Sequence, residues 1–326
     1  MKKAFSILLT VLLLFGTVSF TLTAAAEGVI YLYPSQTLPE HTLRMTAHRG
    51  LSVLAPENTL PAFRLAGEYG FWGAECDISQ TSDGVWVLMH DKDVDRMTDG
   101  EGLVSAFTFD ELSALTIDAG NHVEQYPGTK VPTLVEYLDV CKAYGLHPVI
   151  EIKEVVDVNH LPDLAAILRA REEKDRFVII SFGKDLITGI KTLLPDIPCY
   201  LLGGPCTAQD VDFCIDHGLD GIDTSYNVQA DVVRYAQEND VRLMAWTVDS
   251  VTWTERMADY GITDLTTNCL VPGRAPSAKP STEPTAEPTT QQSGNDNSGS
   301  SGGFWARIVS FFRGIIDWFL RLFRRP

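Results

Sequence analysis

Runs of apolar and β-branched residues alternate with amphipathic patterns of helical spacing through the middle of the chain. Eight of these runs have the length and composition of buried strands: 43–48, 73–78, 147–152, 177–181, 198–202, 219–223, 242–248 and 264–267. Helical patterns separate most of them, for example at 59–69, 134–144, 161–171, 230–239 and 253–260. Because regular alternation of strand and helix is typical of a parallel sheet, these units predict an α/β fold, the closed (β/α)8 TIM barrel.

A ninth apolar run, 85–90, does not fit this alternation. The turn segment Thr81-Ser82-Asp83-Gly84 is all that separates it from the extended chain before it, which is too short for a parallel crossover, so this run is predicted to be the second arm of a hairpin. If the turn is centred near Asp83, the numbers of paired residues sum to about 166. His90 then lies roughly opposite Cys76, between Glu75 and Asp77.

The domain boundaries follow from changes in composition. Residues 43–272 carry the barrel pattern, and the stretch of about 92–130 inside it lacks strand–helix alternation, which predicts a small subdomain inserted at the barrel rim. Residues 273–303 are rich in Pro, Ser, Thr, Glu, Gln and Gly. Because such a segment cannot bury apolar surface, it is predicted to be a disordered linker.

Residues 1–26 have the three-part pattern of an export signal. Lys2 and Lys3 precede an apolar run, Ile7–Phe20, and small residues follow it, ending in three alanines. The alternative is an uncleaved membrane anchor, but the apolar run falls short of the roughly 20 residues that a spanning helix needs. We therefore expect an exported, extracellular protein.

Residues 304–326 are predicted to form a basic amphipathic helix. Five arginines against one aspartate give this tail a formal charge of +4, and Trp305 and Trp318 suit the interface of a membrane. The favoured hypothesis is that the tail holds the protein at an anionic membrane surface, at the outer face of the cell membrane. Docking on a partner protein or on the barrel itself is the alternative.

Charge and cysteine content narrow the function further. The formal net charge of the 326 residues is −17, and the barrel offers no basic stripe, which argues against a nucleic-acid partner. The six cysteines include no CxxC pair and no metal-binding spacing. Cys199 and Cys206 flank a Gly-Gly-Pro turn and are the pair to test for a disulfide, which spacing alone cannot establish.

Titratable residues gather where four of the predicted elements end, at the face where TIM barrels carry their active sites. The residues are His48 and Arg49, Glu75 and Asp77, His90, and Glu151 and Lys153. Three carboxylates on adjacent strands repel one another unless a cation lies between them. Because the ligands are oxygens, one hard divalent cation, Ca²⁺ or Mg²⁺, is predicted.

The remaining groups suit phosphodiester chemistry. Two histidines beside a cation can accept and donate protons, which predicts His48 and His90 as the acid–base pair. Arginine offers a planar pair of donors and lysine a point charge, so Arg49 and Lys153 are predicted to bind phosphate.

In this order and at this spacing, the motifs are specific. They are Ala47-His48-Arg49-Gly50, Pro56-Glu57-Asn58-Thr59, Glu75-Cys76-Asp77, His90-Asp91, Pro132-Thr133-Leu134, Glu151-Ile152-Lys153 and Trp246-Thr247-Val248-Asp249. Together they resemble the glycerophosphodiester phosphodiesterase family, from about residue 46 to 272. The resemblance implies the same roles for the two histidines and three carboxylates. It also implies that a glycerol hydroxyl attacks phosphorus to give a cyclic phosphate that water then opens.

Two further roles rest on the resemblance alone. Glu57 would be a further ligand or an orienting group, although an acidic residue at a helix start is also explained by the helix dipole. Trp246 would line the glycerol pocket, although a tryptophan near a strand end can simply pack, as can Phe182.

The predicted activity is hydrolysis of glycerophosphodiesters to an alcohol and glycerol 3-phosphate, with small or lipid-derived substrates. Deacylated phospholipids, lysophospholipids and glycerol-phosphate wall polymers all present such a diester near a bilayer. Two alternatives remain: a phospholipase C or D type of barrel acting on intact or lyso-phospholipid, and an inactive, membrane-tethered barrel that only binds.

Overall fold

The computed structural model describes residues 30–32, 43–153, 155–171 and 174–272. The predicted export signal, linker and amphipathic tail lie outside these residues. Among the described helices, none is both long and apolar enough to span a membrane.

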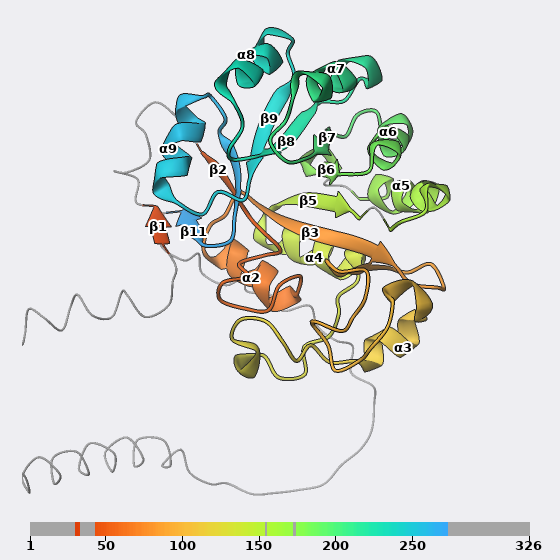
Figure 1. Cartoon of the computed structure of the whole chain (residues 1–326). Helices are drawn as coiled ribbons and strands as arrows, with labels where there is room; N and C mark the ends of the chain where they lie inside the picture. Colours follow the sequence, from red (N-terminus) through yellow and green to blue (C-terminus); the bar gives the residue numbers. More distant parts are fainter. Residues whose placement is uncertain (1–29, 33–42, 154, 172–173, 273–326) are drawn as a thin grey trace, which may run out of the picture. The chain divides into compact units, whose positions relative to one another are not determined.

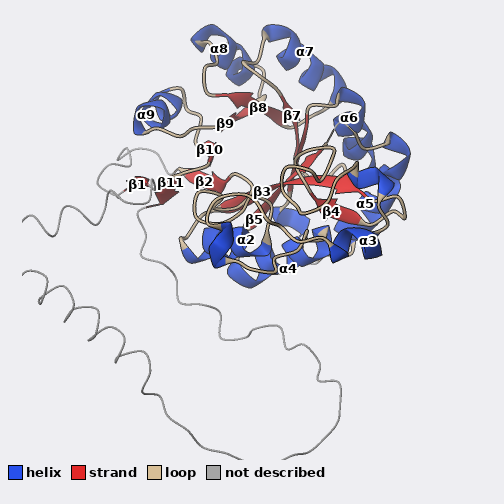
Figure 2. Ribbon diagram, turned by 60° about the horizontal axis from the view of Figure 1, so that its bottom comes forward, coloured by secondary structure: helices blue, strands red, loops and turns tan. Residues whose placement is uncertain are grey.

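Eight parallel strands close into a barrel, which confirms the predicted fold (Figures 1 and 2). They are β2 (Arg44–Ala47), β3 (Gly73–Gln80), β5 (His147–Ile152), β6 (Val178–Ser181), β7 (Cys199–Leu202), β8 (Gly221–Ser225), β9 (Arg242–Trp246) and β10 (Asp264–Thr267). The sheet runs from β2 through β10 back to β3, and the pairing of Thr46 with Gly73 closes the ring. Figure 2 shows this ring with the helices outside it.

Seven α-helices of the described chain connect successive barrel strands. They are α2 (Leu60–Glu68), α4 (Leu134–Tyr144), α5 (Leu161–Arg169), α6 (Lys184–Leu193), α7 (Ala208–His217), α8 (Ala230–Glu238) and α9 (Val251–Asp259). Helix α4 shows why such boundaries are sharp. Thr133 and Glu136 form a reciprocal capping box at its start, and Gly145 ends it with a left-handed backbone.

The strand β8 begins two residues later than the pattern 219–223 predicts. Helix α7 ends at Gly218, whose φ of 64° turns the chain, and the amide of Leu219 donates back to the carbonyl of Cys214. Leu219 therefore completes the helix cap before the strand starts. The other barrel strands start and end within two residues of their predicted limits.

Apolar residues separate into two layers across the barrel wall. Outward-facing side chains such as Cys76, Ile150 and Leu265 pack with the helices in the main core. Inward-facing side chains form a smaller cluster that includes Ile180, Leu202 and Met244. The strand residues of this inner cluster come from β5, β6, β7 and β9, whereas β3 places buried carboxylates inside the barrel. The barrel interior thus has an apolar side and an acidic side.

The predicted hairpin is present. Strand β4 (Trp86–Leu88) pairs antiparallel with β3, with Ile78 opposite Leu88 and Gln80 opposite Trp86, so that paired numbers sum to 166 as predicted. Beyond this ladder the amide of Met89 donates to the carbonyl of Asp77, and His90 follows. The hairpin therefore brings His90 beside the acidic strand.

Residues 92–130 fold outside the strand–helix alternation. They contain α3 (Phe109–Ala114) and two single-turn 3₁₀ helices, η1 (Val104–Ala106) and η2 (Val123–Gln125). Their buried side chains form an apolar cluster separate from the main core, with members that include Val94, Met97 and Leu112. The segment, drawn in yellow in Figure 1, is thus held by its own small core next to the hairpin.

Short elements complete the described chain. Two more 3₁₀ turns, η3 (Val158–His160) and η4 (Lys174–Arg176), flank α5, and strand β1 (Ile30–Leu32) pairs in parallel with β11 (Leu270–Pro272). The described residues contain no disulfide, and Cys199 and Cys206 are both buried.

Candidate active site

The predicted site residues surround one cavity of about 140 Å³ at the carboxyl ends of the barrel strands. Its walls are His48, Arg49, Glu75, His90, Glu151, Lys153, Ile180, Phe182, Leu202, Asp223, Trp246 and Thr266. The structure therefore brings together, around one space, side chains that follow or belong to strands far apart in the sequence. Of the predicted site residues, Asp77 and Glu57 are not part of the cavity wall.

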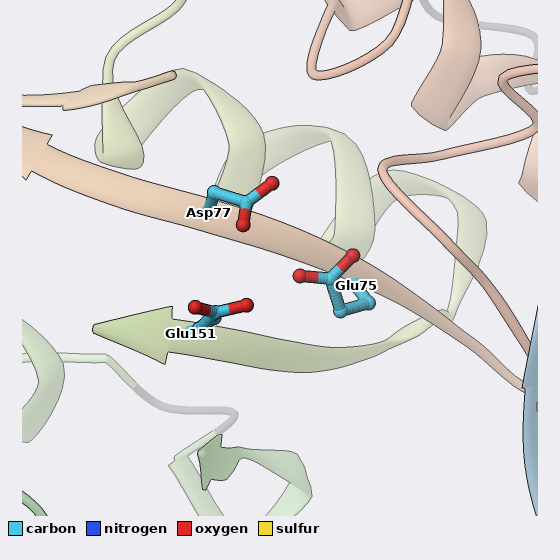
Figure 3. Close-up of side chains that lie close together, drawn as sticks. All are labelled: Glu75, Asp77 and Glu151. Atoms are coloured by element: carbon cyan, nitrogen blue, oxygen red, sulfur yellow. The ribbon is translucent and has the colours of Figure 1, made fainter. Parts of the chain in front are cut away.

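Three carboxylates form the centre of the site (Figure 3). Glu75 and Asp77 belong to β3 and Glu151 to β5, and the strand register sets Asp77 beside Glu151. One oxygen from each lies within 4.8 Å of the others, and all three residues are buried. In Figure 3 the three carboxyl groups point toward one another.

Two cations lie against this acidic centre. Lys153 Nζ lies 2.7 Å from Glu151 Oε1 and 3.2 Å from Asp77 Oδ1. Arg49 Nε lies 3.4 Å from Asp77 Oδ2. Burial acts to raise the pKa of Asp77, but Lys153, Arg49 and His90 outweigh it and lower the pKa to about 2. Asp77 is therefore the carboxylate that keeps its charge in the protein alone.

The other two carboxyl groups behave differently. Burial and repulsion from Asp77 raise the pKa of Glu151 to about 7. Burial raises the pKa of Glu75 well above its usual value, and Asp77 and Glu151 add to the effect. Without a counter-ion the raised pKa values favour the protonated forms of these two groups, because two side-chain cations do not neutralise three buried negative charges.

The donor set fits a hard divalent cation. All three groups offer oxygen, the ligand atom that Ca²⁺ and Mg²⁺ prefer. Glu75 Oε1 is buried and has no hydrogen-bond partner among the described residues, so an acceptor is left available at the centre of the cluster. The described residues place no histidine or cysteine in this cluster.

A loop with a strained backbone positions Arg49 against Glu75. After β2 the chain turns at Arg49, whose φ of 57° lies in the left-handed region that residues other than glycine rarely adopt. In this conformation the amide of Arg49 donates to Glu75 Oε2 at 2.8 Å. Gly50 follows with φ 76°, and a Cβ there would lie 2.7 Å from the backbone of Ala62 in α2. A side chain at residue 50 would therefore push the loop away from the helix.

His48 is held through its Nδ1 atom. Nδ1 lies 2.7 Å from Asn268 Oδ1, and Asn268 in turn donates from Nδ2 to Asp249 Oδ2 at 2.7 Å. Asp249 Oδ1 also accepts hydrogen bonds from Thr267 and from the amide of Asn268. Burial and the neighbouring Arg49 lower the pKa of His48. The ring is thus mostly neutral near pH 7, with Nε2 3.9 Å from Glu75 Oε2.

His90 is held through Nδ1 by a carboxylate. Nδ1 lies 2.7 Å from Asp91 Oδ1, and Arg96 Nε donates to Asp91 Oδ2 at 2.5 Å. Arg96 also donates to Glu57 Oε1 at 2.7 Å, and Arg49 donates to the same oxygen at 3.0 Å. Glu57 therefore contacts two arginines and is not one of the three carboxylates that come together.

The opposite wall of the cavity is apolar. Trp246 and Phe182 meet edge to face, with ring centroids 5.7 Å apart. The indole Nε1 of Trp246 is shared between the carbonyls of Gly203 and Asp223, at 3.0 and 3.2 Å. Because both rings line the cavity, neither side chain packs only in the core. The arrangement sets an apolar surface across from the charged groups.

Several polar residues at the site have no role in the sequence analysis. Asn58 donates from Nδ2 to Asp77 Oδ2 at 2.7 Å and accepts from the amide of Asp77 at 3.1 Å. Asn58 and Asp249 lie inside motifs that resemble the family, so their place in these motifs could have indicated that they belong to the site. Asn268 and Asp223 lie outside any motif, and their strands bring them to the site only after barrel closure.

Comparison with known proteins identifies close relatives. The model of the glycerophosphoryl diester phosphodiesterase family matches residues 48–270. A glycerophosphodiester phosphodiesterase of Caldanaerobacter subterraneus is 32% identical over 226 residues, which cover 68% of this chain and 92% of that protein. One of Bacillus subtilis is 30% identical over 284 residues, covering 78% of this chain and 91% of that protein.

The fold is also similar to solved structures. A phosphodiesterase of Oleispira antarctica, solved in complex with the product sn-glycerol-3-phosphate, has a TM-score of 0.65 and 25% sequence identity. The match covers 69% of this chain and 92% of that one.

Proposed function

Since the chain belongs to the glycerophosphoryl diester phosphodiesterase family, we propose that it hydrolyses glycerophosphodiesters to an alcohol and glycerol 3-phosphate. The observation that carries the proposal is one cavity lined by two histidines, two side-chain cations and two carboxyl groups of the acidic cluster. A binding protein would have no use for two imidazoles whose Nδ1 atoms are each fixed by a partner.

The hydrogen bonds assign the proton roles. Asn268 must turn its carbonyl toward His48, because its amide group faces the carboxylate of Asp249, which has no hydrogen to donate. His48 Nδ1 therefore carries the hydrogen, and Nε2 is left with a lone pair that can accept a proton. The carboxylate of Asp91 pairs with His90 Nδ1 and fixes the orientation of the ring, and His90 is assigned as the proton donor.

In the first step, His48 accepts the proton of the glycerol hydroxyl next to the ester as that oxygen attacks phosphorus. His90 donates a proton to the departing oxygen, which leaves as the alcohol, and a cyclic phosphate remains. In the second step the roles reverse: His90 takes a proton from water, and His48 returns one to the glycerol oxygen. Both histidines end in their starting state.

Phosphate binding falls to the groups nearest the acidic centre. Arg49 and Lys153 neutralise charge on the phosphodiester as it grows in the transition state. Glu75, Asp77 and Glu151 would hold one divalent cation, Ca²⁺ or Mg²⁺, which supplies electrophilic stabilisation to the phosphate oxygens when bound. Asn58 and Glu57 position Asp77 and Arg49 without contacting substrate.

The place of action is proposed from the two ends of the sequence. Residues 1–26 would direct export, and the basic amphipathic tail 304–326 would hold the enzyme at the anionic outer face of the membrane. Glycerophosphodiesters that derive from membrane lipids would then be at hand. A net charge of −17 makes the basic tail the natural point of contact with an anionic surface.

The test is incubation of the purified protein with glycerophosphocholine after chelation, and again with added Mg²⁺ or Ca²⁺. Glycerol 3-phosphate and choline should appear only with the cation. Phosphocholine in place of glycerol 3-phosphate would indicate cleavage on the other side of phosphorus, as in a phospholipase C. No turnover of glycerophosphocholine or of lysophosphatidylcholine with either cation would refute the enzymatic proposal.

A further inference from the structure

A buried carboxyl group on β8 lines the cavity, but it is not one of the three clustered carboxylates and makes no hydrogen bond to the two histidines that are proposed to transfer protons. Asp223 is 1% exposed, and its Oδ1 atom has no hydrogen-bond partner among the described residues. An unpaired buried acceptor opposes folding, because the group has lost its water without gaining a partner. The structure therefore gives Asp223 no evident stabilising role.

The strand register turns this carboxyl group into the barrel. Asp223 pairs with Leu202 on one side and Met244 on the other, and both of these belong to the inward-facing apolar cluster. The backbone carbonyl of Asp223 accepts from the indole of Trp246 at 3.2 Å. Asp223 thus lies next to Trp246, on the side of the cavity that carries the aromatic rings.

Apart from the charged groups already described, a second cavity-lining residue has a buried polar atom with no partner. Thr266 on β10 is 2% exposed, and its Oγ1 atom also lacks a hydrogen-bond partner among the described residues. The cavity therefore presents one buried carboxyl and one buried hydroxyl in addition to the charged groups. A ligand with its own hydroxyl groups could pair with both, since a hydroxyl both donates and accepts.

Charge and size narrow the kind of ligand. Neither Asp223 nor Thr266 offers a positive charge, so the charge of a phosphate group is better placed at Arg49 and Lys153. Asp223 is also not one of the three carboxylates that come together as a possible metal site. The cavity volume of about 140 Å³ is below the range of roughly 300–1,000 Å³ for pockets that enclose drug-sized ligands. Only a small part of a substrate fits inside.

We propose that Asp223 and Thr266 form a hydroxyl-binding subsite that recognises the glycerol moiety, with the larger alcohol left at the barrel rim. The inference rests on the proposed function, and it adds that selection for glycerol comes from these two residues and not from the phosphate-binding cations. The apolar face of Trp246 would cover the carbon side of the glycerol.

The experiment measures binding of glycerol 3-phosphate and of inorganic phosphate to the full chain by calorimetry, with the cation present. The variants are Asp223→Leu, which removes the carboxyl at similar size, Asp223→Asn, which keeps hydrogen-bonding capacity, and Thr266→Val. Thermal melting of each variant runs alongside. Asp223→Leu should bind glycerol 3-phosphate about 10-fold or more weakly, with phosphate affinity changed by less than about 2-fold.

Asp223→Asn should lose less than Asp223→Leu, and Thr266→Val should show the same selective loss to a smaller extent. Melting temperatures should stay the same or rise, since an unpaired buried group has been removed. Equal loss for both ligands in the variants, or unchanged affinity for glycerol 3-phosphate, would overturn the proposal. If Asp223→Leu does not fold, Asp223→Asn and Thr266→Val decide. A wild-type protein that neither binds glycerol 3-phosphate nor cleaves glycerophosphocholine would instead refute the proposed function.

Discussion

His48 Nδ1 lies 2.7 Å from Asn268 Oδ1, although 220 residues separate the two in the chain. Asp249 accepts a hydrogen bond from the side-chain amide of Asn268, so Asp249, Asn268 and His48 form one hydrogen-bonded line that ends at the site. Each of the three residues follows a different barrel strand. The line fixes both the orientation of the imidazole and which nitrogen carries the hydrogen.

Breaking this line should lower the rate of the chemical step. We expect Asn268→Ala to reduce kcat about 10–100-fold with little change in KM, because the ring can then rotate and change tautomer. Asp249→Asn should act in the same direction, since an amide no longer dictates how Asn268 turns. Steady-state kinetics with thermal melting of each variant measure this.

The matched control is the double variant Asp249→Asn with Asn268→Asp. It keeps one carboxylate and one amide in the line, so it should recover much of the lost kcat. If the double variant is as slow as Asn268→Ala, while both melt normally, the orienting role is wrong.

Replacement of His48 or His90 by alanine should reduce kcat by about 10²–10⁴, the usual range for a positioned acid or base. Cation affinity should be unchanged in these variants, because neither imidazole belongs to the carboxylate cluster. Asp77→Asn should do the reverse and weaken cation binding first. Calorimetric titration with the cation distinguishes the histidine variants from the carboxylate variant. Weakened cation binding in His90→Ala would contradict the assignment of His90 to proton transfer alone.

Between about pH 4.5 and 7, the contribution of Glu151 to the stability of the cation-free protein should fall as the pH rises. Glu151 has its usual pKa near 4.5 when unfolded and about 7 in the fold, so its protonated form favours the fold. That contribution, ~3 kcal/mol by the pKa difference, is complete below about pH 4.5 and is lost by about pH 7. Asp77 has the opposite sign, because its pKa is lowered to about 2, and it loses its contribution as the pH falls from 3.8.

A bound cation should reverse the trend set by Glu151. Binding below about pH 7 must displace its proton, so apparent affinity should drop about tenfold for each pH unit. The rise in melting temperature on adding Mg²⁺ or Ca²⁺ should therefore be larger at pH 8 than at pH 5.5. The matched variant Glu151→Gln should lose the part of this pH dependence that Glu151 contributes, while Glu75, whose pKa is also raised, keeps the remainder. An equal rise at both pH values in the wild type would contradict the argument.

The tail 304–326 should carry the protein to anionic membranes. We expect the full chain to float with vesicles that contain phosphatidylglycerol and much less with phosphatidylcholine alone, and a chain ending at residue 303 to float with neither. Binding should weaken as salt screens the arginines. Equal flotation of the two chains would show that the tail is not the anchor.

The barrel could be predicted from the sequence because each strand–helix unit repeats a local pattern. The hairpin register followed from turn length alone, and it placed His90 correctly beside β3. The site residues Glu75, Asp77 and Glu151 could be grouped because parallel strands end at one face and alternate residues share a side. These inferences need only strand order and direction.

The contacts that could not be predicted from the sequence depend on how the closed barrel brings distant residues together. Asn268 looks like an ordinary residue after the last barrel strand, and only the pairing of β10 with β2 sets it against His48. Asp223 reads as a polar residue within a strand, and its lack of a partner is a property of the packed interior. The contact of Glu57 with Arg96 likewise depends on how residues 92–130 fold back.

The seam between β2 and β10 joins the first and last strands of the barrel, and the amide of His48 donates across it to the carbonyl of Thr267. A ribosome would have made Glu75, Asp77, His90, Glu151 and Lys153 long before it reached Asn268. A chain cut short between Lys153 and Asn268 would carry nearly every reactive group and still leave its proton acceptor unsupported. Catalysis would thus report that synthesis of the barrel had been completed.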